Sequence, residues 1–574
     1  MSEIRVRKTD VATRNALESL GLHPLMAQLF AARGITANQS LKSSLADLLP
    51  PGQMLGIDDA ALTLADALES GSRIVVVGDY DCDGATATAV AVRGMRMMLQ
   101  AMGATAEQAA YHIDFIVPDR FVHGYGLSPE IVELAAEREP DLLVTVDNGI
   151  ASLKGVERAN DLGIGVVITD HHLPAETLPD ALAIVNPNQQ GCPFPSKNIA
   201  GVGVMFYVLM ALRTELRERG AFDVKTQPRL DKLLDLVALG TVADVVKLDD
   251  NNRLLVAEGL RRIRAGAFQP AIGALFDVAD KSARKATATD LGFIIGPRLN
   301  AAGRLADMSL GIKALLTDDP GVALEMARNL HQINKERQKI EGGMKEEALM
   351  RLEDFDPKDS RSLVVSDPQW HQGVVGLLAS RLKDKYFLPT IAFAPGVNGE
   401  WKGSGRSIPG IHLRDVLDLV VKRLPEGAVP KFGGHAMAAG LTVATDALAG
   451  FSETFEAVVR ELSDEAVFAR YTETDGSLPT GYCNASTVDM LAEAVWGQGF
   501  PPPLFADDFE VLGQRLVKEV HSKLNLRRDG QNFTALRWNS TEPLHGTIRA
   551  AYRVQRDDFT GGDAIQLVIE QVAR

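Results

Sequence analysis

Short apolar runs alternate with helical stretches between residues 73 and 266. The runs at residues 74–77, 142–146 and 164–168 are rich in β-branched side chains and predict strands. Strands that alternate with helices are typical of a parallel sheet covered by helices. An aspartate follows each run, and the carboxyl ends of parallel strands meet at one edge of a sheet, where ligands bind. We therefore expect an α/β domain with a polar crevice.

The next region lacks prolines after Pro320 and is rich in Ala, Glu, Lys, Arg, Met and Leu up to residue 354. This composition predicts a long helix, with an interruption near Gly342 and Gly343. A second α/β pattern follows, with strands at residues 363–365 and 390–393, a helix at 376–385 and a glycine-rich end at 433–440. We expect two α/β lobes, joined by the long helix around a cleft.

The C-terminal region changes to short alternating segments such as residues 532–538 and 565–570, which predict a small β-barrel. The expected domains are an N-terminal segment 1–50, an α/β domain 51–266, a helical connector 267–357, a second α/β domain 358–462 and a barrel 463–574. A chain of 574 residues is long enough for several such units.

Composition and charge narrow the class of protein. Hydrophobic residues make up 46% and charged residues 24%, as in globular proteins rather than disordered or fibrous ones. The net charge of −15 argues against a protein that coats nucleic acid through overall positive charge. Residues 511–556 differ, because nine Lys/Arg and three Asp/Glu give 9 − 3 = +6 there. A local basic surface on an acidic protein is the expectation.

The cysteines and the N-terminal sequence help to predict the cellular compartment. Cys82, Cys192 and Cys483 are too few and too scattered for a disulfide framework or a zinc finger. The charged N-terminus leads into no apolar stretch long enough for a signal peptide or a membrane span. We expect a cytoplasmic protein without a membrane association.

The strongest chemical signal is the run Asp79-Tyr80-Asp81-Cys82-Asp83-Gly84, in which three carboxylates occupy every second position after a strand. A turn at Gly84 can gather two or three of them. Carboxylates this close repel one another unless a cation neutralises them. A calcium loop and a solvated acidic turn are the alternatives, although the glycine spacing and terminal glutamate of an EF-hand are missing.

Three further motifs contribute possible ligands. Asp147 closes a strand before Asn148 and Gly149, and by itself it is better explained as a turn residue than as a ligand. His171 and His172 follow Asp170 at another strand end, and Asp244 follows a helical stretch. Oxygen ligands with an imidazole suit Mn²⁺ or Mg²⁺, whereas structural zinc favours thiolates. Two ions bridged by one carboxylate are a plausible arrangement for hydrolysis.

These motifs resemble, in order, those of the DHH phosphoesterases, and residues 433–436 (Gly-Gly-His-Ala) resemble the signature of their accessory DHHA1 domain. The chain is most similar to the RecJ family over residues 50–460, and its tail resembles the oligonucleotide-binding (OB) barrel of bacterial members. The resemblance implies an α/β fold with DHH and DHHA1 lobes and an OB-like barrel.

The resemblance also implies roles for individual residues. Asp81 and Asp147 would hold one divalent ion with Asp79 as an auxiliary ligand, while Asp83, Asp147, His171 and Asp244 would hold a second. Asp147 would bridge the two Mn²⁺ or Mg²⁺ ions, and His172 would face the scissile phosphate or the leaving oxygen. Val77 stands where relatives carry a histidine, which leaves the first ion one ligand short. The catalytic set is Asp81, Asp83, Asp147, His171, His172 and Asp244.

A polyanionic substrate also needs basic and polar groups near the carboxylates. The family pattern implies phosphate binding by a group of residues in glycine-rich loops: Arg120, Arg298, Asn300, Arg304, Ser404, Arg406, Ser407 and His435. Surface or capping roles are the alternative for any single arginine, and a tight turn for Gly433 and Gly434. In the tail, Phe533 and Trp538 lie among Arg527, Arg528 and Arg537 and either stack on bases or fill the barrel core.

The function implied by the resemblance is hydrolysis of single-stranded DNA in the 5′→3′ direction to 5′-mononucleotides, in DNA recombination and repair. Single-stranded DNA would be the substrate, single-strand binding protein and a RecQ-type helicase the partners, and a monomer the working form. Two alternatives stay open: a DHH phosphodiesterase for short oligonucleotides or cyclic dinucleotides, and a non-catalytic DNA-binding scaffold like Cdc45. Intact metal motifs favour an enzyme over the scaffold.

Overall fold

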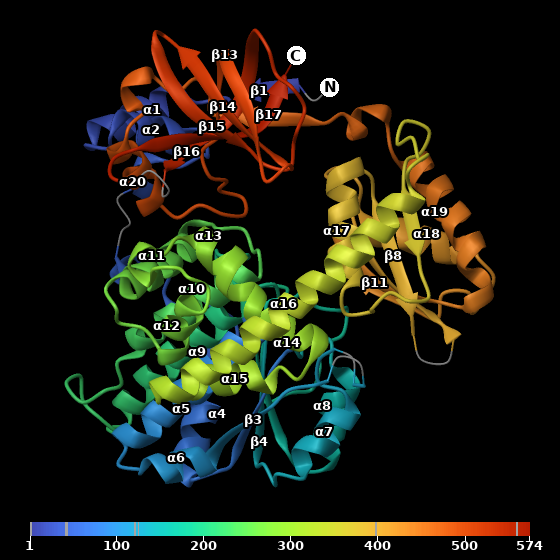
Figure 1. The fold of residues 1–574 in the computed structure, drawn as a ribbon. Coiled ribbons are helices and arrows are strands. Elements are labelled where there is room, and N and C mark those ends of the chain that lie inside the picture. Colours follow the sequence, from blue (N-terminus) through green and yellow to red (C-terminus); the bar gives the residue numbers. More distant parts are fainter. Residues whose placement is uncertain are drawn as a thin grey trace. The chain divides into compact units, whose positions relative to one another are not determined.

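The computed structural model describes residues 3–40, 44–119, 122–123, 125–396, 399–557 and 561–573. The chain divides into two compact units. The larger unit comprises Val6–Asn334 and Thr474–Glu570, and the smaller unit comprises Met1–Arg5, Lys335–Glu473 and Gln571–Arg574 (Figure 1).

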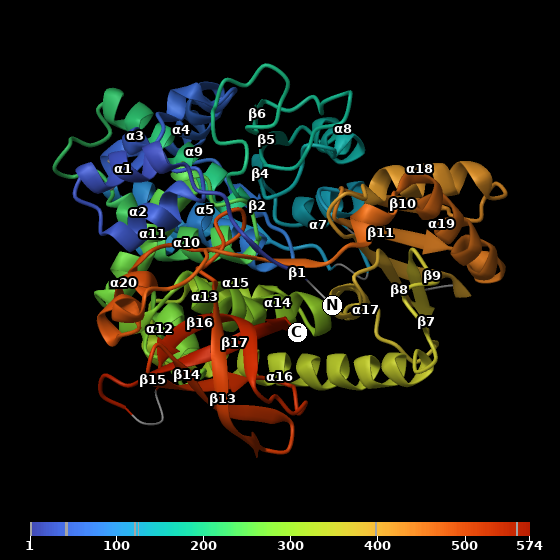
Figure 2. The same ribbon diagram turned by 90° about the horizontal axis from the view of Figure 1, so that it is seen from above.

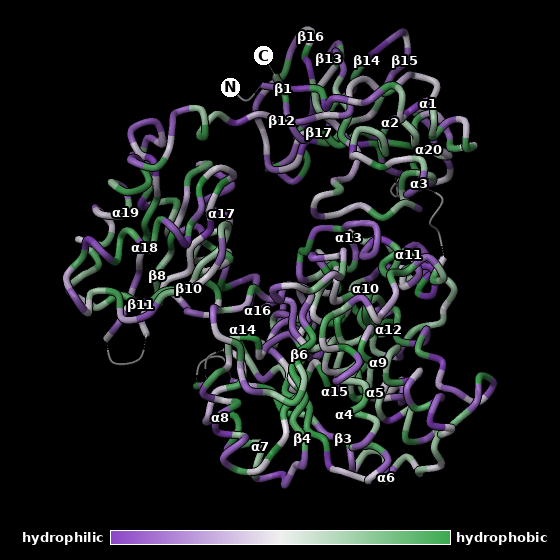
Figure 3. The backbone as a smooth tube through the Cα atoms, turned by 180° about the vertical axis from the view of Figure 1, so that it is seen from behind, coloured by the Kyte–Doolittle hydropathy of each residue, from purple (hydrophilic) through white to green (hydrophobic). Residues whose placement is uncertain are grey.

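A parallel sheet forms the core of the larger unit. Its strands are β2 (Ile74–Val77), β3 (Ile113–Ile116), β4 (Leu142–Val146), β5 (Gly165–Thr169) and β6 (Ala183–Val185). Their order is β3-β2-β4-β5-β6, and every neighbouring pair is parallel. Strands β2 and β4 are buried along their whole length, and Figure 3 shows this region as largely hydrophobic. The parallel sheet confirms the predicted α/β fold. Parallel strands need cover on both faces.

Helices cover both faces of this sheet. One apolar cluster joins Val75, Leu143 and Ile168 to side chains of α7 (Pro129–Ala136) and α8 (Leu153–Asp161). The helices α4 (Ile57–Ser70), α5 (Cys82–Ala101) and α9 (Gly201–Glu218) pack together and contact strands of the sheet. Helices α5 and α9 thereby bring their N-terminal turns to the carboxyl edge of the sheet.

The rest of the segment Val6–Asn334 is mainly helical. Its helices are α1 (Val11–Ser19), α2 (Pro24–Ala31), α3 (Ala37–Ser40), α6 (Ala106–His112), α10 (Leu234–Ala243), α11 (Asp250–Arg264), α12 (Pro270–Asp277), α13 (Ala288–Asp290), α14 (Gly296–Leu305) and α15 (Ser309–Leu316). A π-helical turn, Leu291–Ile295, joins α13 to α14. None of the described helices is long and apolar enough to cross a membrane.

The predicted long helix is α16, Pro320–Arg351, and the boundary between the two units falls within it. The predicted interruption near Gly342 and Gly343 is wrong, since α16 is continuous through both glycines (Figure 2). Each glycine costs a helix about 1 kcal/mol relative to alanine, which packing can offset. Next to them the buried Glu341 accepts hydrogen bonds from Arg337 (2.7 Å) and Arg381 (2.8 Å), and Met344 is buried.

The smaller unit contains a mixed sheet of order β10-β11-β9-β8-β7. Its strands are β7 (Leu363–Ser366), β8 (Thr390–Pro395), β9 (Trp401–Arg406), β10 (Lys431–Gly434) and β11 (Ala438–Val443). Only the β7–β8 pair of this sheet is parallel. Its helices are α17 (Val375–Tyr386), α18 (Leu413–Arg423) and α19 (Leu448–Leu462), and the last two form an apolar core with Phe393 and Leu441.

The C-terminal strands form a closed barrel of order β13-β14-β15-β17-β16, which confirms the predicted barrel. The strands are β13 (Phe505–Val517), β14 (His521–Arg528), β15 (Gln531–Arg537), β16 (Thr547–Arg556) and β17 (Ile565–Ala573). Helix α20 (Ala485–Glu493) precedes them, and β1 (Glu3–Val6) pairs with β12 (Tyr471–Thr474). Closure leaves the barrel without an unpaired edge.

A buried ion pair fixes the N-terminal helices to the segment before the barrel. Asp475 accepts bonds from Arg33 through Nη1 (2.8 Å) and Nη2 (2.9 Å), and from Arg7 Nη1 (3.0 Å). The guanidinium of Arg33 also lies over the ring of Trp496. The N-terminal helices therefore belong structurally with the barrel junction.

Candidate active site

The first acidic motif forms the connection from β2 to α5. Asp81 caps α5, since its Oδ1 accepts a bond from the Gly84 amide at 3.0 Å. A side chain at residue 84 would collide with Asp79, because a Cβ there would lie 2.5 Å from the Asp79 Cβ. Asp83 is fully buried, and its two oxygens accept bonds from the amides of Gly201 (2.7 Å) and Val202 (3.0 Å). The N-terminus of α9 thus holds this carboxylate.

Asp147 lies directly after β4 in a left-handed conformation, with φ of 62°. Such a φ is uncommon outside glycine and is found at functional sites. Helix α9 approaches so closely that a Cβ at Gly201 would lie 2.5 Å from Asp147 Oδ1. The side-chain Nδ2 of Asn148 donates to the carbonyls of Val146 (2.9 Å) and Val77 (3.1 Å), which fixes this turn to β2.

The third motif follows β5. Buried Asp170 accepts bonds from the amides of Ile150 (2.9 Å), His171 (2.7 Å) and His172 (3.1 Å), and contacts His172 Nδ1 at 2.7 Å. Burial by itself raises the pKa of Asp170, but its bond to His172 and the histidine charges lower the pKa overall. Burial lowers the pKa of His172, yet Asp170 raises it above its ordinary value overall. Asp170 is a site residue that the sequence prediction left out, although it stands inside the motif.

The predicted ligands come together in three overlapping groups, whose ligand atoms lie within 4.8 Å of one another. The groups are Asp79, Asp81 and Asp147; Asp83, His171 and Asp244; and Asp147, His171 and His172. His171 Nε2 lies 3.1 Å from Asp147 Oδ1 and 3.5 Å from Asp244 Oδ2. Asp79, Asp81 and Asp147 thus form one cluster, and Asp83, His171 and Asp244 form a second, which His171 connects to Asp147.

The electrostatics of these clusters favour a cation. Burial, followed by the charge of Asp81, raises the pKa of Asp83 to about 7. Burial and the neighbouring carboxylates also hold the pKa of Asp147 and of Asp244 well above their ordinary range. A divalent ion supplies the opposite charge that lets such a group ionise. Carboxylates with an imidazole fit Mn²⁺ or Mg²⁺, so the residues present suit these metals.

Two side chains outside the predicted ligand set contact this site. Asn300 on α14 accepts a bond from the Cys82 amide at 2.8 Å and so fixes the first acidic motif. The Tyr125 hydroxyl donates to the Asp147 carbonyl at 2.9 Å and lies 3.1 Å from His172 Nδ1. Sequence reasoning missed Tyr125, for which the only local signal was an aromatic residue in a glycine-rich loop.

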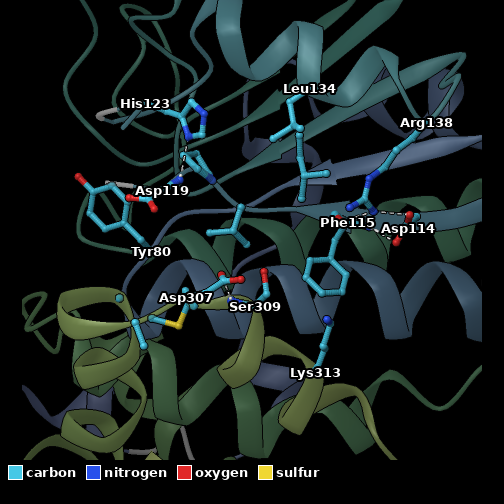
Figure 4. Close-up of a pocket in the computed structure, with 16 residues that line it drawn as sticks. Tyr80, Asp114, Phe115, Asp119, His123, Leu134, Arg138, Asp307, Ser309 and Lys313 are labelled. Atoms are coloured by element: carbon cyan, nitrogen blue, oxygen red, sulfur yellow. Dashed lines mark hydrogen bonds and ion pairs between the residues drawn. The ribbon is translucent and has the colours of Figure 1, made fainter. Parts of the chain in front are cut away.

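A cavity of about 500 Å³ lies beside Tyr80, at the carboxyl end of β3 (Figure 4). Tyr80 and His123 lie toward one end of it, and the ion pair between Asp114 and Arg138 (2.5 Å) toward the other. Tyr80 belongs to the first acidic motif, so this polar cavity adjoins the candidate metal site.

Three of the four substrate-binding candidates in the segment Val6–Asn334 lie on one helix. Arg298, Asn300 and Arg304 lie on α14, and Arg120 lies outside the described residues. Arg298 is buried, donates to His331 Nδ1 at 3.2 Å and to the Ile294 carbonyl, and burial lowers its pKa. Its guanidinium therefore helps to attach α14 to α16.

The predicted substrate-binding residues of the smaller unit lie on β9 or near it. Arg406 Nη1 donates to Ser404 Oγ (3.0 Å) and to the Gly405 carbonyl (2.7 Å), and burial lowers the pKa of Arg406. The buried Ser407 hydroxyl donates to the Ile411 carbonyl at 2.8 Å. His435 follows Gly434 in the β10–β11 connection, and its amide donates to the Ala438 carbonyl at 2.8 Å. Gly434 has a φ of 146°, and a Cβ there would lie 2.4 Å from that carbonyl oxygen.

The aromatic residues of the tail separate into two kinds. Phe533 is 9% exposed and its ring lies in the barrel core near Phe509, whereas Trp538 is 51% exposed. Arg528 is buried in an ion pair with Asp507 at 2.5 Å. Of the two alternatives for Phe533, filling the barrel core is therefore the one that the structure shows, because alternate residues of a barrel strand point inward. Trp538 stays a candidate.

Three family models match the chain in order. They are the DHH family, N-terminal domain (residues 73–241), the DHHA1 domain (residues 360–461) and the RecJ OB domain (residues 474–571).

Curated relatives and solved structures agree with these matches. The single-stranded-DNA-specific exonuclease RecJ of Escherichia coli K12 is 46% identical over 99% of both chains. The crystal structure of RecJ from Thermus thermophilus in complex with Mn²⁺ covers 100% of this chain and 79% of its own, at 29% identity and a TM-score of 0.81. The complex of that protein with Mg²⁺ covers 100% and 78%, at 28% identity and a TM-score of 0.76.

Proposed function

The chain belongs to the RecJ family, and we propose on this basis that it hydrolyses single-stranded DNA from the 5′ end and releases 5′-mononucleotides. Recombination and repair are the processes that use such an activity. The observation that carries the proposal is the pair of ligand clusters around Asp147 at the carboxyl edge of the sheet. Two-metal sites of this kind hydrolyse phosphodiesters.

We assign two Mn²⁺ or Mg²⁺ ions to these clusters. Asp79, Asp81 and Asp147 would hold one ion, and Asp83, Asp147, His171 and Asp244 the other. When bound, such ions supply the positive charge that activates water and stabilises charge on phosphate oxygens. The first ion should bind more weakly than the second, because Val77 offers no ligand atom. Val77 is buried in the apolar cluster between the sheet and helices α7 and α8.

The protein's own groups position the substrate around these ions. Asp170 holds His172 through Nδ1, which orients the ring and favours its charged form beside a phosphate. Tyr125 fixes both the Asp147 turn and His172. In this assignment Asp81, Asp83, Asp147, His171, His172 and Asp244 form the catalytic set.

We propose that the smaller unit holds the 5′ phosphate at the start of α17. A Cβ at Gly376 would lie 2.9 Å from Ser404 Oγ and 3.0 Å from Arg406 Nη2, so the first turn of α17 lies against both side chains. A helix N-terminus with an arginine is a good anion site. Ser407 and His435 would also bind phosphate in the smaller unit, and Arg120, Arg298, Asn300 and Arg304 would bind the strand in the larger unit.

The domain boundaries and partners are also part of the proposal. The proposed domains 51–266, 358–462 and 463–574 contain the three matched family regions. Residues 1–50 precede the first domain, and residues 267–357 connect the first domain to the second. An enzyme that needs a single strand depends on other proteins to expose it. Single-strand binding protein and a RecQ-type helicase fill that need for a cytoplasmic monomer.

Replacing one ligand from each cluster tests the assignment. Asp81→Ala and His171→Ala should each abolish Mn²⁺-dependent release of mononucleotides from 5′-labelled single strands, with 3′-labelled, duplex and RNA strands as comparisons. Asp59→Ala, at an exposed position on α4, is the matched control and should keep full activity. Undiminished release by both ligand variants would refute the assignment.

The exposed face of the barrel distinguishes a long-strand exonuclease from a phosphodiesterase for short oligonucleotides. Lys523, Asn525 and Trp538 lie on this face, and a stacked base contributes about 1–3 kcal/mol. Trp538→Ala should raise KM several-fold on strands that are long enough to reach the barrel from the metal site, and it should leave the KM for trinucleotides unchanged. Equal effects on both lengths would favour the short-substrate alternative.

A further inference from the structure

Phe293 is the most exposed large apolar side chain among the described residues, at 81%. An aromatic side chain normally contributes by burying a large area, so a ring in this setting gains little within its own unit. Phe293 lies in the π-helical turn Leu291–Ile295. Leu291 and Ile295 of the same turn are fully buried, so the turn is firmly anchored while Phe293 projects from it.

The turn that carries Phe293 and the first residue of α14 pack against two of the segments that carry predicted metal ligands. A Cβ at Gly292 would lie 3.1 Å from Val242 Cγ1. A Cβ at Gly296 would lie 3.1 Å from Ala243 Cβ and 3.8 Å from Cys82 Sγ. Ala243 precedes Asp244, and Cys82 stands between Asp81 and Asp83. Small residues on both sides of Phe293 thus bring its turn against the backbone that carries metal ligands from each cluster.

The same stretch continues into the helix of the phosphate-binding candidates. Helix α14 begins at Gly296 and carries Arg298, Asn300 and Arg304, and Asn300 bonds to the Cys82 amide. A π-helical turn changes the direction of the side chains around it and occurs often at functional sites. The segment therefore carries an exposed aromatic ring a few residues before these polar groups in the chain.

From these contacts we infer that Phe293 stacks on a nucleobase of the bound strand beside the metal site. The inference rests on the proposed exonuclease function. A phenyl ring offers no hydrogen bonds to the base edge, so the contact tolerates every base. Both faces of a base inside a duplex are already covered by its neighbours. Phe293 is thereby a specificity-determining residue that favours an unstacked single strand over a duplex.

Kinetics on matched strands test the inference. Phe293→Ala should raise KM on single-stranded DNA about tenfold, the order of loss of one base–aromatic stack. Phe293→Trp should keep the wild-type KM because it keeps a flat ring. The control is Tyr111→Ala, an exposed aromatic that lies just before β3, at the amino edge of the sheet. This control should leave KM unchanged.

Strands with one abasic site identify the contact itself. When the abasic site occupies the stacked position, wild type and Phe293→Ala should have the same KM, and at other positions they should differ. Mn²⁺ affinity and melting temperature should not change in Phe293→Ala, because the ring is exposed.

Three results would overturn the inference: equal KM for wild type and Phe293→Ala on intact strands, a loss on abasic strands as large as on intact ones at every position, or a fall in Mn²⁺ affinity or melting temperature. Failure of wild type to degrade single strands at all would instead refute the proposed function. The two failures are therefore distinguishable.

Discussion

Buried aspartates occur in two different settings in the larger unit. At the sheet edge, Asp83 and Asp147 lie beside other carboxylates, and the neighbouring groups with positive character are the two histidines. At the barrel, Asp475 is paired with Arg33, and Asp507 with Arg528 at 2.5 Å. A buried charge needs a partner of opposite sign. Where the protein supplies that partner the group is structural, and where it does not, the pattern indicates a metal site.

Asp147→Asn should produce the largest effect and sharpen this contrast. Asparagine tolerates the left-handed conformation at residue 147, so the fold is kept. Loss of a hydrogen-bond partner of a metal ligand costs up to about 100-fold in activity. Loss of the ligand itself should reduce Mn²⁺-dependent hydrolysis by more than that. In EDTA the melting temperature should rise, because one repelling carboxylate is gone. A fall in the melting temperature of Asp147→Asn in EDTA, in place of the expected rise, would contradict the metal-site interpretation.

Arg33→Met should have the opposite effect on stability. It leaves Asp475 buried with Arg7 as its remaining charged partner, and breaking a buried pair costs about 3–5 kcal/mol. We expect a fall toward the lower end of that range in the free energy of unfolding from urea titration. Arg549→Met is the control, since Arg549 and Asp508 form an exposed pair on the barrel that contributes at most about 1 kcal/mol. Similar losses in both variants would break the comparison.

Asp235 is an intermediate case, with a smaller expected effect. It is fully buried, and its Oδ2 accepts a bond from the Gln269 amide at 2.6 Å. Burial raises its pKa from 3.8 to about 6. The folded chain therefore binds this proton more tightly than the unfolded chain, so the group's contribution to stability is full below pH 4 and is lost as the pH rises through 6.

The measurement is the difference in free energy of unfolding between wild type and Asp235→Asn from pH 4 to pH 8. Asparagine keeps an acceptor for Gln269 but does not titrate. A shift of about two pKa units corresponds to about 3 kcal/mol, so the variant should gain up to that amount on wild type across this range. A difference that does not depend on pH would show that Asp235 has an ordinary pKa.

Local patterns were sufficient for much of the fold and for most of the metal site. The strands at residues 74–77 and 142–146 were predicted because a fully buried parallel strand is a continuous apolar run. Asp81, Asp83, His171 and the other predicted ligands stand in short motifs, so their chemistry is visible without the fold. The continuity of α16 through Gly342 and Gly343 was not visible, because packing offset the helix-breaking tendency of glycine.

The sequence by itself determined the elements, the ligand types and the family, because these depend on neighbouring residues. Only the tertiary structure decided which distant groups meet: Asn300 with Cys82, 218 positions apart, and Arg33 with Asp475, 442 apart. It also decided that Phe533 points into the barrel while Phe293 and Trp538 are exposed. Burial and pairing depend on contacts between distant segments, which no local pattern of residues specifies.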